Sequence, residues 1–222
     1  MKIHLIQLSS DPNHAKEIAS FNDLNQLDVD YIRHVNPNYT ELPPKGVVNG
    51  EDHIIKMTKK HNEWGLTPPH YGCFKSHCQA IASAMCKDHP TLICENDTKI
   101  INPTIMNQKI QDGAKYMLKN KYKILRFETP SHGDERNRGC YKQLTDFLWE
   151  SNRMIGAYCY MVNPNEKVWW LETILKKGWH AWDIFLNYIF QSEHIPMLSY
   201  KEYLTDFYRG GSIIDPDNPE KQ

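Results

Sequence analysis

The sequence predicts a single α/β domain, residues 1–222, with a mostly parallel central sheet. Short apolar segments typical of buried strands alternate with longer segments of helical periodicity. That alternation is typical of strand–helix–strand units, whose crossovers leave neighbouring strands parallel. The chain has 222 residues, 40% of them hydrophobic, which is enough to bury a core and too apolar for general disorder.

The amino-terminal part predicts two strands and two helices. Residues 2–8 (KIHLIQL) are typical of a first strand. The segment SSDP at 9–12 combines N-cap side chains with a proline suited to a first helical turn, so a helix is expected to run to Leu24. Three elements are then expected: a strand at 29–35, a loop rich in Asn, Pro and Gly at 36–50, and a polar helix at 51–64.

The clearest helical pattern lies before a short apolar run. Phe74, Cys78, Ile81 and Met85 recur at helical spacing and predict one buried stripe. Residues 91–94 (TLIC) are then typical of a buried strand.

The second half of the chain continues the alternation. Residues 128–153 are polar and charged, and the pattern favours a loop over a site, in which Arg136 and Arg138 either contact a diphosphate or are simply solvated. The last 20 or so residues read as a tail. The expected elements are helices at 104–119, 165–177 and 181–190, and strands at 123–127, 157–162 and 195–198.

Charge and apolar patterning exclude two broad classes of function. Lys and Arg number 26 against 27 Asp and Glu, so the chain lacks the positive excess of a nucleic-acid-coating protein. It has no run of about 18 apolar residues for a transmembrane helix, and residues 2–8 are too short and polar for a signal sequence. Six cysteines are too few for a disulfide framework in a chain of this size, which favours a reducing, cytoplasmic location.

The triplet Glu95-Asn96-Asp97 is the most informative spot. Two carboxylates spaced by one residue, just past a buried strand, can converge on a divalent cation, and oxygen ligands suit Mn²⁺ or Mg²⁺. The alternative is a solvated turn without a metal.

The surrounding residues resemble glycosyltransferase family 25, the lipopolysaccharide-biosynthesis and collagen-galactosyltransferase group. The family pattern Leu-Thr-x-Gly-Glu-x-Gly-Cys-x-x-Ser-His, followed by a strand ending in Glu-Asp-Asp, is matched in part by LT at 66–67, GCFKSH at 72–77 and END at 95–97. The similarity extends outward over nearly the whole chain, to HLIQLSSDPNHA at the start and to residues 156–164. The chain departs from the pattern in Pro69-His70 and in Asn96, and it lacks the arginines after the first strand.

The resemblance implies a Rossmann-like fold of the GT-A type and an inverting, metal-assisted sugar transfer from a nucleotide diphosphate, with UDP-galactose as the family's usual donor. It implies that Glu95 and Asp97 hold the metal ion and that a glycan or other hydroxyl group is the acceptor. The residues expected to bind the donor are Gln7, Leu8, Ser76, His77 and Asn96.

Inverting transfer needs a general base on the acceptor hydroxyl. Asp183 is the candidate, because it lies at the family's late acidic position. The alternative is that its carboxylate caps the start of a helix. Trp179 and Trp182 flank this segment and are candidates for stacking on the acceptor sugar, although core packing is the commoner role of such residues.

His77 lies one helical turn after Cys73, so the pair has the spacing of zinc ligands. The sequence favours instead a structural histidine that holds the segment before the acidic triplet. Two rival functions stay open: a nucleotide- or sugar-binding protein without activity, indicated by Asn96 and His70, and a glycoside hydrolase, which the close spacing of Glu95 and Asp97 disfavours.

Overall fold

The computed structural model describes most of the predicted core elements. The helix expected to end at Leu24, the loop expected at 36–50 and the helix expected at 51–64 lie outside the described residues. The structure describes residues 1–9, 27–33, 68–95, 98–127, 139–152, 156–176, 179–202 and 204–207.

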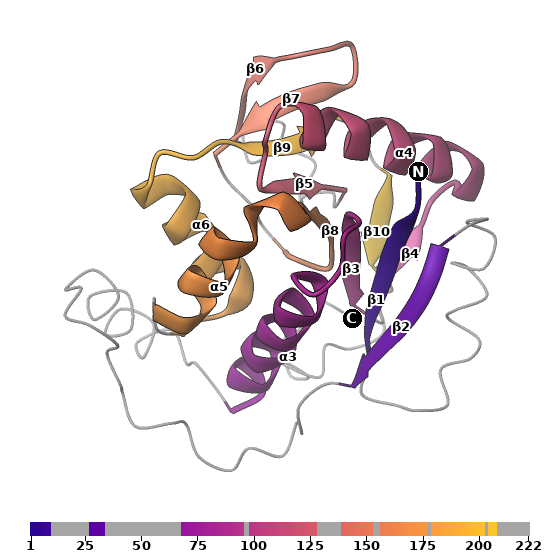
Figure 1. Cartoon of the computed structure of the whole chain (residues 1–222). Coiled ribbons are helices and arrows are strands. Elements are labelled where there is room, and N and C mark those ends of the chain that lie inside the picture. Colours follow the sequence, from indigo (N-terminus) through magenta and orange to yellow (C-terminus); the bar gives the residue numbers. More distant parts are fainter. Residues whose placement is uncertain are drawn as a thin grey trace, which may run out of the picture.

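An eight-stranded sheet forms the centre of the molecule, in the order β2-β1-β3-β8-β5-β9-β7-β6 (Figure 1). The apolar runs expected to be strands lie in it, with shifts of a few residues at some ends. Its strands are β1 (Ile3–Ser9), β2 (Leu27–Arg33), β3 (Thr91–Glu95), β5 (Ile124–Arg126), β6 (Cys140–Gln143), β7 (Leu148–Ser151), β8 (Cys159–Val162) and β9 (Met197–Tyr200).

The sheet is mixed, so the expected mostly parallel, Rossmann-like arrangement is not confirmed. β1 runs parallel to β2 and β3, and β5 runs parallel to β9. β8 is antiparallel to both of its neighbours, β3 and β5, and β7 is antiparallel to β9 and β6. All four residues of β8 are buried. A strand covered on both faces reads as one apolar run whichever way it points, so its sequence does not reveal its direction.

Helices cover both faces of the sheet (Figure 1). One face packs against α3 (Pro68–Ala84), α5 (Lys167–Lys176) and α6 (Trp182–Ser192), and the other against α4 (Pro103–Lys119). A short 3-10 helix, Pro164–Glu166, precedes α5. The alternation of β1 divides its side chains between two cores: Ile6 and Leu8 pack on the three-helix side, and Ile3 and Leu5 on the α4 side.

The predicted apolar stripe on α3 is confirmed in its main residues. Phe74 and Ile81 are buried against the sheet and α6, and Met85, just beyond the helix end, is buried with them. Cys78 is only half-buried at the edge of the same core. α4 begins where expected, because the Asn102 side chain caps the helix by accepting a 3.1 Å hydrogen bond from the Ile105 amide.

Two segments expected to lack regular structure contain strands. The hairpin of β6 and β7 lies within the expected loop at 128–153, whose first part, 128–138, lies outside the described residues. β10 (Thr205–Phe207) lies within the expected tail and pairs antiparallel with β4 (Thr98–Ile100). β6 is largely exposed, so its residues show no alternation of apolar and polar side chains. The paired strands β4 and β10 have three residues each, which is too short for a pattern to be recognised in the sequence.

Gly113 lies at a close approach of α4 to the sheet. A Cβ atom here would lie 2.5 Å from Leu125 Cδ2 and 2.5 Å from the Tyr200 hydroxyl oxygen, and that hydroxyl donates a 2.6 Å hydrogen bond to the Lys109 carbonyl. We expect Gly113→Ala to lower the free energy of unfolding by about 1–3 kcal/mol, because overpacking outweighs a gain of about 1 kcal/mol in helix propensity. Urea denaturation measures the change. Lys115→Ala, on the exposed side of α4, is the control, and a more stable Gly113→Ala variant would contradict the packing argument.

Candidate functional site

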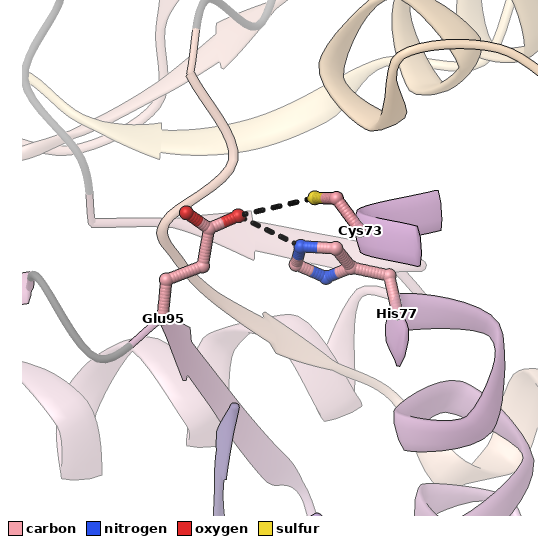
Figure 2. Close-up of side chains that lie close together, drawn as sticks. All are labelled: Cys73, His77 and Glu95. Atoms are coloured by element: carbon pink, nitrogen blue, oxygen red, sulfur yellow. Dashed lines mark hydrogen bonds and ion pairs between the residues drawn. The ribbon is translucent and has the colours of Figure 1, made fainter. Parts of the chain in front are cut away.

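A cluster of polar side chains lies where β3 ends beside the first turns of α3 (Figure 2). Glu95 is the last residue of β3 and its side chain is 22% exposed. Cys73 and His77 stand one turn apart on α3 and point toward it. α3 and the end of β3 therefore bring Cys73 and His77 of the GCFKSH motif next to Glu95, the first residue of the END motif.

His77 connects Glu95 to the sheet behind it. Its Nε2 lies 2.9 Å from Glu95 Oε1, and its Nδ1 lies 2.8 Å from the Tyr160 hydroxyl. A carboxylate only accepts hydrogen bonds, so Nε2 carries the hydrogen toward Glu95. Nδ1 then accepts a hydrogen bond from the Tyr160 hydroxyl. The chain Tyr160–His77–Glu95 therefore fixes the orientation of the carboxylate.

Burial determines the protonation states of His77 and Tyr160. His77 is fully buried, and burial lowers its pKa to about 3 even though the negative charge of Asp183 raises it. The imidazole is therefore neutral near pH 7. Burial raises the pKa of Tyr160 well above its ordinary value, so the phenol keeps the hydrogen that it donates to His77. The imidazole that donates to Glu95 is thus neutral.

Asp183 lies in the first turn of α6, near enough to His77 to affect its pKa. Its Oδ1 accepts a 2.8 Å hydrogen bond from the Ile184 amide, and its Oδ2 accepts one of 3.2 Å from the Gly156 amide. Gly156 has φ +71°, a conformation that favours glycine, and this turn aims its N–H at the carboxylate. The carboxylate thus bonds a backbone amide of its own helix, but it is not the N-cap, which is Ala181 and has no side-chain capping hydrogen bond. It also contacts Gly156, just before β8.

The two tryptophans proposed to stack on an acceptor differ in exposure. Trp182 is 2% exposed and stacks on His77, with ring centroids 4.9 Å apart and an interplanar angle of 4°. Trp179 is half-buried and meets Tyr71 edge-on at 5.1 Å. Trp179 therefore offers more ring surface to a ligand, whereas Trp182 packs the site from within.

The expected donor-binding residues lie at different depths. Gln7 and Leu8 are buried on β1, with Leu8 opposite Glu95 in the strand register. In the described part of the chain, neither polar atom of the Gln7 amide has a hydrogen-bond partner. Ser76 is buried and donates a 2.9 Å hydrogen bond to the Gly72 carbonyl within α3. Asn96 and Asp97 lie outside the described residues.

The cluster contains three possible metal ligands. Cys73 Sγ, His77 Nε2 and a Glu95 oxygen lie within 4.8 Å of one another. For Mn²⁺ or Mg²⁺, which prefer oxygen, Glu95 supplies one suitable ligand among the described residues. Its Oε1 faces Cys73 and His77, while its other oxygen points away from both (Figure 2). The hard-cation role expected for Glu95 stays a prediction, since Asp97, its expected partner ligand, lies outside the described residues.

Sequence reasoning missed two residues of this region. Tyr160 lies in a predicted strand, but its contact with His77 depends on strand order, which the sequence does not show. Arg126 ends β5, is 1% exposed and donates a 3.0 Å hydrogen bond to Ser151 Oγ. The sequence contained an indication of this contact, because Arg126 interrupts the apolar run ILRF. Buried arginines are rare without polar partners, so such a residue predicts a polar partner inside the core.

Comparisons with known proteins show only a shared fold. No family model matches the chain and no curated protein matches it, so no family assignment is confirmed. The structure of UDP-glucose pyrophosphorylase complexed with UDP-glucose matches with a TM-score of 0.50 at 11% identity, covering 98% of each chain. An apo UDP-glucose pyrophosphorylase gives 0.40 at 11% identity, with 93% of this chain and 75% of that chain covered. A197 from STIV gives 0.47 at 13% identity, with coverages of 94% and 86%.

Within the part of the chain that the structure describes, none of the helices combines the length and the apolar character needed to span a bilayer.

Proposed function

We propose that this protein binds a nucleoside-diphosphate sugar and transfers the sugar to a hydroxyl acceptor with inversion, as a metal-assisted glycosyltransferase of the family 25 type. The observation that carries the proposal is the 2.9 Å contact between His77 and Glu95. It joins the Ser-His motif to the acidic motif, the two segments on which the resemblance depends. The fold shared with UDP-glucose pyrophosphorylase supports the proposal at the level of architecture.

In this proposal Glu95 and Asp97 hold Mn²⁺ or Mg²⁺, which would neutralise charge on the diphosphate leaving group. His77 and Tyr160 act through Glu95, because their hydrogen bonds fix one of its two oxygens. UDP is the expected nucleotide and galactose the expected sugar, with a glycan as the acceptor in the cytoplasm. These assignments come from the resemblance.

Asp183 is the proposed base for the acceptor hydroxyl. Its carboxylate is fixed by the Ile184 and Gly156 amides. A carboxylate positioned in this way can receive a proton without first reorganising. Trp179 is the better placed of the two tryptophans for stacking on an acceptor, because it is only half-buried.

The first test is thermal denaturation with UDP-, GDP- and CMP-linked sugars, each with Mn²⁺ and with a chelator. A ligand that binds the native state raises the midpoint, by about 2.7 kcal/mol of stabilisation at 100 times its Kd. We expect a Mn²⁺-dependent increase with the UDP sugars. No increase with any of these donors would contradict the proposal.

Asp183→Asn tests the base. Asparagine keeps one oxygen for one of the two backbone amides and turns its NH₂ group toward the other, so we expect a lower melting temperature, while kcat of the folded variant falls about 10²- to 10⁴-fold. Nucleoside diphosphate release in the presence of acceptor measures kcat. Asp146→Asn makes the same chemical change on the exposed turn between β6 and β7 and should leave kcat unaltered. If Asp183→Asn retains most of its kcat, Asp183 is not the base.

A second candidate is a nucleotide-sugar-binding protein without turnover. The observation that favours it is the engagement of both Asp183 oxygens by backbone amides, as expected of a purely structural carboxylate. This candidate predicts the same thermal shifts with UDP sugars. It also predicts no release of nucleoside diphosphate with any acceptor, which separates it from the transferase.

A further inference from the structure

Cys73, His77 and Glu95 combine the three side-chain types that bind zinc: thiolate, imidazole and carboxylate. Cys73 and His77 stand at i and i+4 on α3, which places both on one face of the helix. Glu95 meets that face from the end of β3 (Figure 2). We propose that these three residues form a Zn²⁺ site with a fourth position open to water or a ligand.

The separations suit one ion. Cys73 Sγ lies 3.8 Å and His77 Nε2 lies 2.9 Å from Glu95 Oε1, and all three ligand atoms lie within 4.8 Å of one another. Tetrahedral ligands at bond lengths of about 2.0–2.3 Å are separated from each other by about 3.5 Å. A zinc ion therefore requires His77 and Glu95 to move apart by about 0.6 Å, and Cys73 and His77, which lie within 4.8 Å of each other, to approach the same separation. The 3.8 Å separation of Cys73 Sγ from Glu95 Oε1 is already close to this value.

Tyr160 supplies the outer contact that zinc-binding histidines have. Without metal, its hydroxyl donates to His77 Nδ1, and Nε2–H donates to Glu95. With zinc on Nε2, the hydrogen of the imidazole resides on Nδ1 and is donated to the Tyr160 oxygen, which can accept as well as donate. The 2.8 Å contact serves both arrangements, so the imidazole stays neutral and keeps its orientation.

The donor set favours zinc over the hard cations of the proposed transfer. A thiolate and an imidazole select Zn²⁺ or a similar ion, whereas Mn²⁺ and Mg²⁺ prefer carboxylates and water. The other Glu95 oxygen points away from Cys73 and His77, so the proposed zinc site does not use it (Figure 2). The zinc site needs no sugar donor, so it stands or fails independently of the proposed function.

The other cysteines near this segment do not share the cluster. Cys94 and Cys159 lie 3.3 Å apart, but both are buried in the core on the α4 side of the sheet. Cys86 is exposed beyond the end of α3 and is absent from the group of converging ligands. Cys86→Ser is therefore a matched control for Cys73→Ser.

The test titrates metal-free, full-length protein with Co²⁺ and with Zn²⁺, with no nucleotide sugar present. We expect Co²⁺ to give the thiolate charge-transfer band and the intense visible bands of a four-coordinate ion, at one equivalent. Zn²⁺ should abolish this spectrum at one equivalent and raise the melting temperature. Competition with a chromophoric chelator gives the Zn²⁺ affinity.

Cys73→Ser should remove the charge-transfer band and weaken Zn²⁺ binding by at least about 100-fold, since loss of even an outer-shell partner costs about 10- to 100-fold. Cys86→Ser should keep both the band and the affinity. Circular dichroism establishes that each variant is folded. The Co²⁺ spectrum of the wild-type protein tests the site even if a variant does not fold. A wild-type spectrum without a thiolate band, or loss of the band in Cys86→Ser, overturns the site, whereas failure of every sugar donor to bind leaves it intact.

Discussion

Replacing Glu95 by glutamine is expected to lower the rate of nucleoside diphosphate release by about 10²- to 10³-fold, the loss typical of removing one charge-stabilising group from an active site. Glutamine has nearly the same size and keeps an oxygen that can accept the hydrogen bond from His77 Nε2. The variant therefore removes the negative charge while leaving the local packing in place. The measurement is steady-state release from the donor selected by thermal denaturation, with Mn²⁺ varied.

Glu202→Gln provides the matched control for this change. Its carboxylate is 55% exposed and lies 3.4 Å from Lys109 Nζ, a surface ion pair worth about 1 kcal/mol or less. We expect the control to keep its turnover and Mn²⁺ dependence. Equal turnover in wild type and Glu95→Gln would show that the carboxylate takes no part in the chemistry. The contact between Glu95 and His77 would then have a structural role only.

Elements with a strong local pattern could be predicted from the sequence. The apolar run of β3 and the apolar stripe on α3 each indicate a buried element, because a covered strand or helix face must be apolar along its length. The Glu95 position at the end of β3 followed directly from that reading. Sequence alone therefore identified the two segments whose residues His77 and Glu95 the structure brings together.

Features that depend on distant partners could not be predicted. β8 brings Tyr160 behind His77 only because it is inserted antiparallel between β3 and β5. The hydrophobic periodicity of a single segment does not indicate the order of strands in a sheet. Likewise β10 is a strand only because it pairs with β4, and its three residues carry no period of their own. The zinc-ligand spacing of Cys73 and His77 was visible, but the approach of Glu95 to both was not.

Trp182→Ala is expected to give the largest loss of stability, about 3–5 kcal/mol in the free energy of unfolding. The ring is buried and contacts His77 at 4.9 Å, Phe185 at 5.4 Å and Phe74 at 5.7 Å between centroids. Alanine leaves a cavity between α3, α6 and the sheet that these neighbours cannot refill without leaving their own positions. For a chain of this size the loss corresponds to a fall of about 10 °C in melting temperature, measurable by calorimetry together with urea denaturation.

Two further variants separate the reasons for this loss. Leu175→Ala truncates an apolar side chain that is 71% exposed on α5, and it should change stability by less than about 0.5 kcal/mol. Trp182→Phe keeps an aromatic face on His77 and should lose less than the alanine variant. If Trp182→Ala instead costs no more than Leu175→Ala, then His77 is held by Glu95 and Tyr160 alone. That result would contradict the packing role assigned to the buried Trp182 ring.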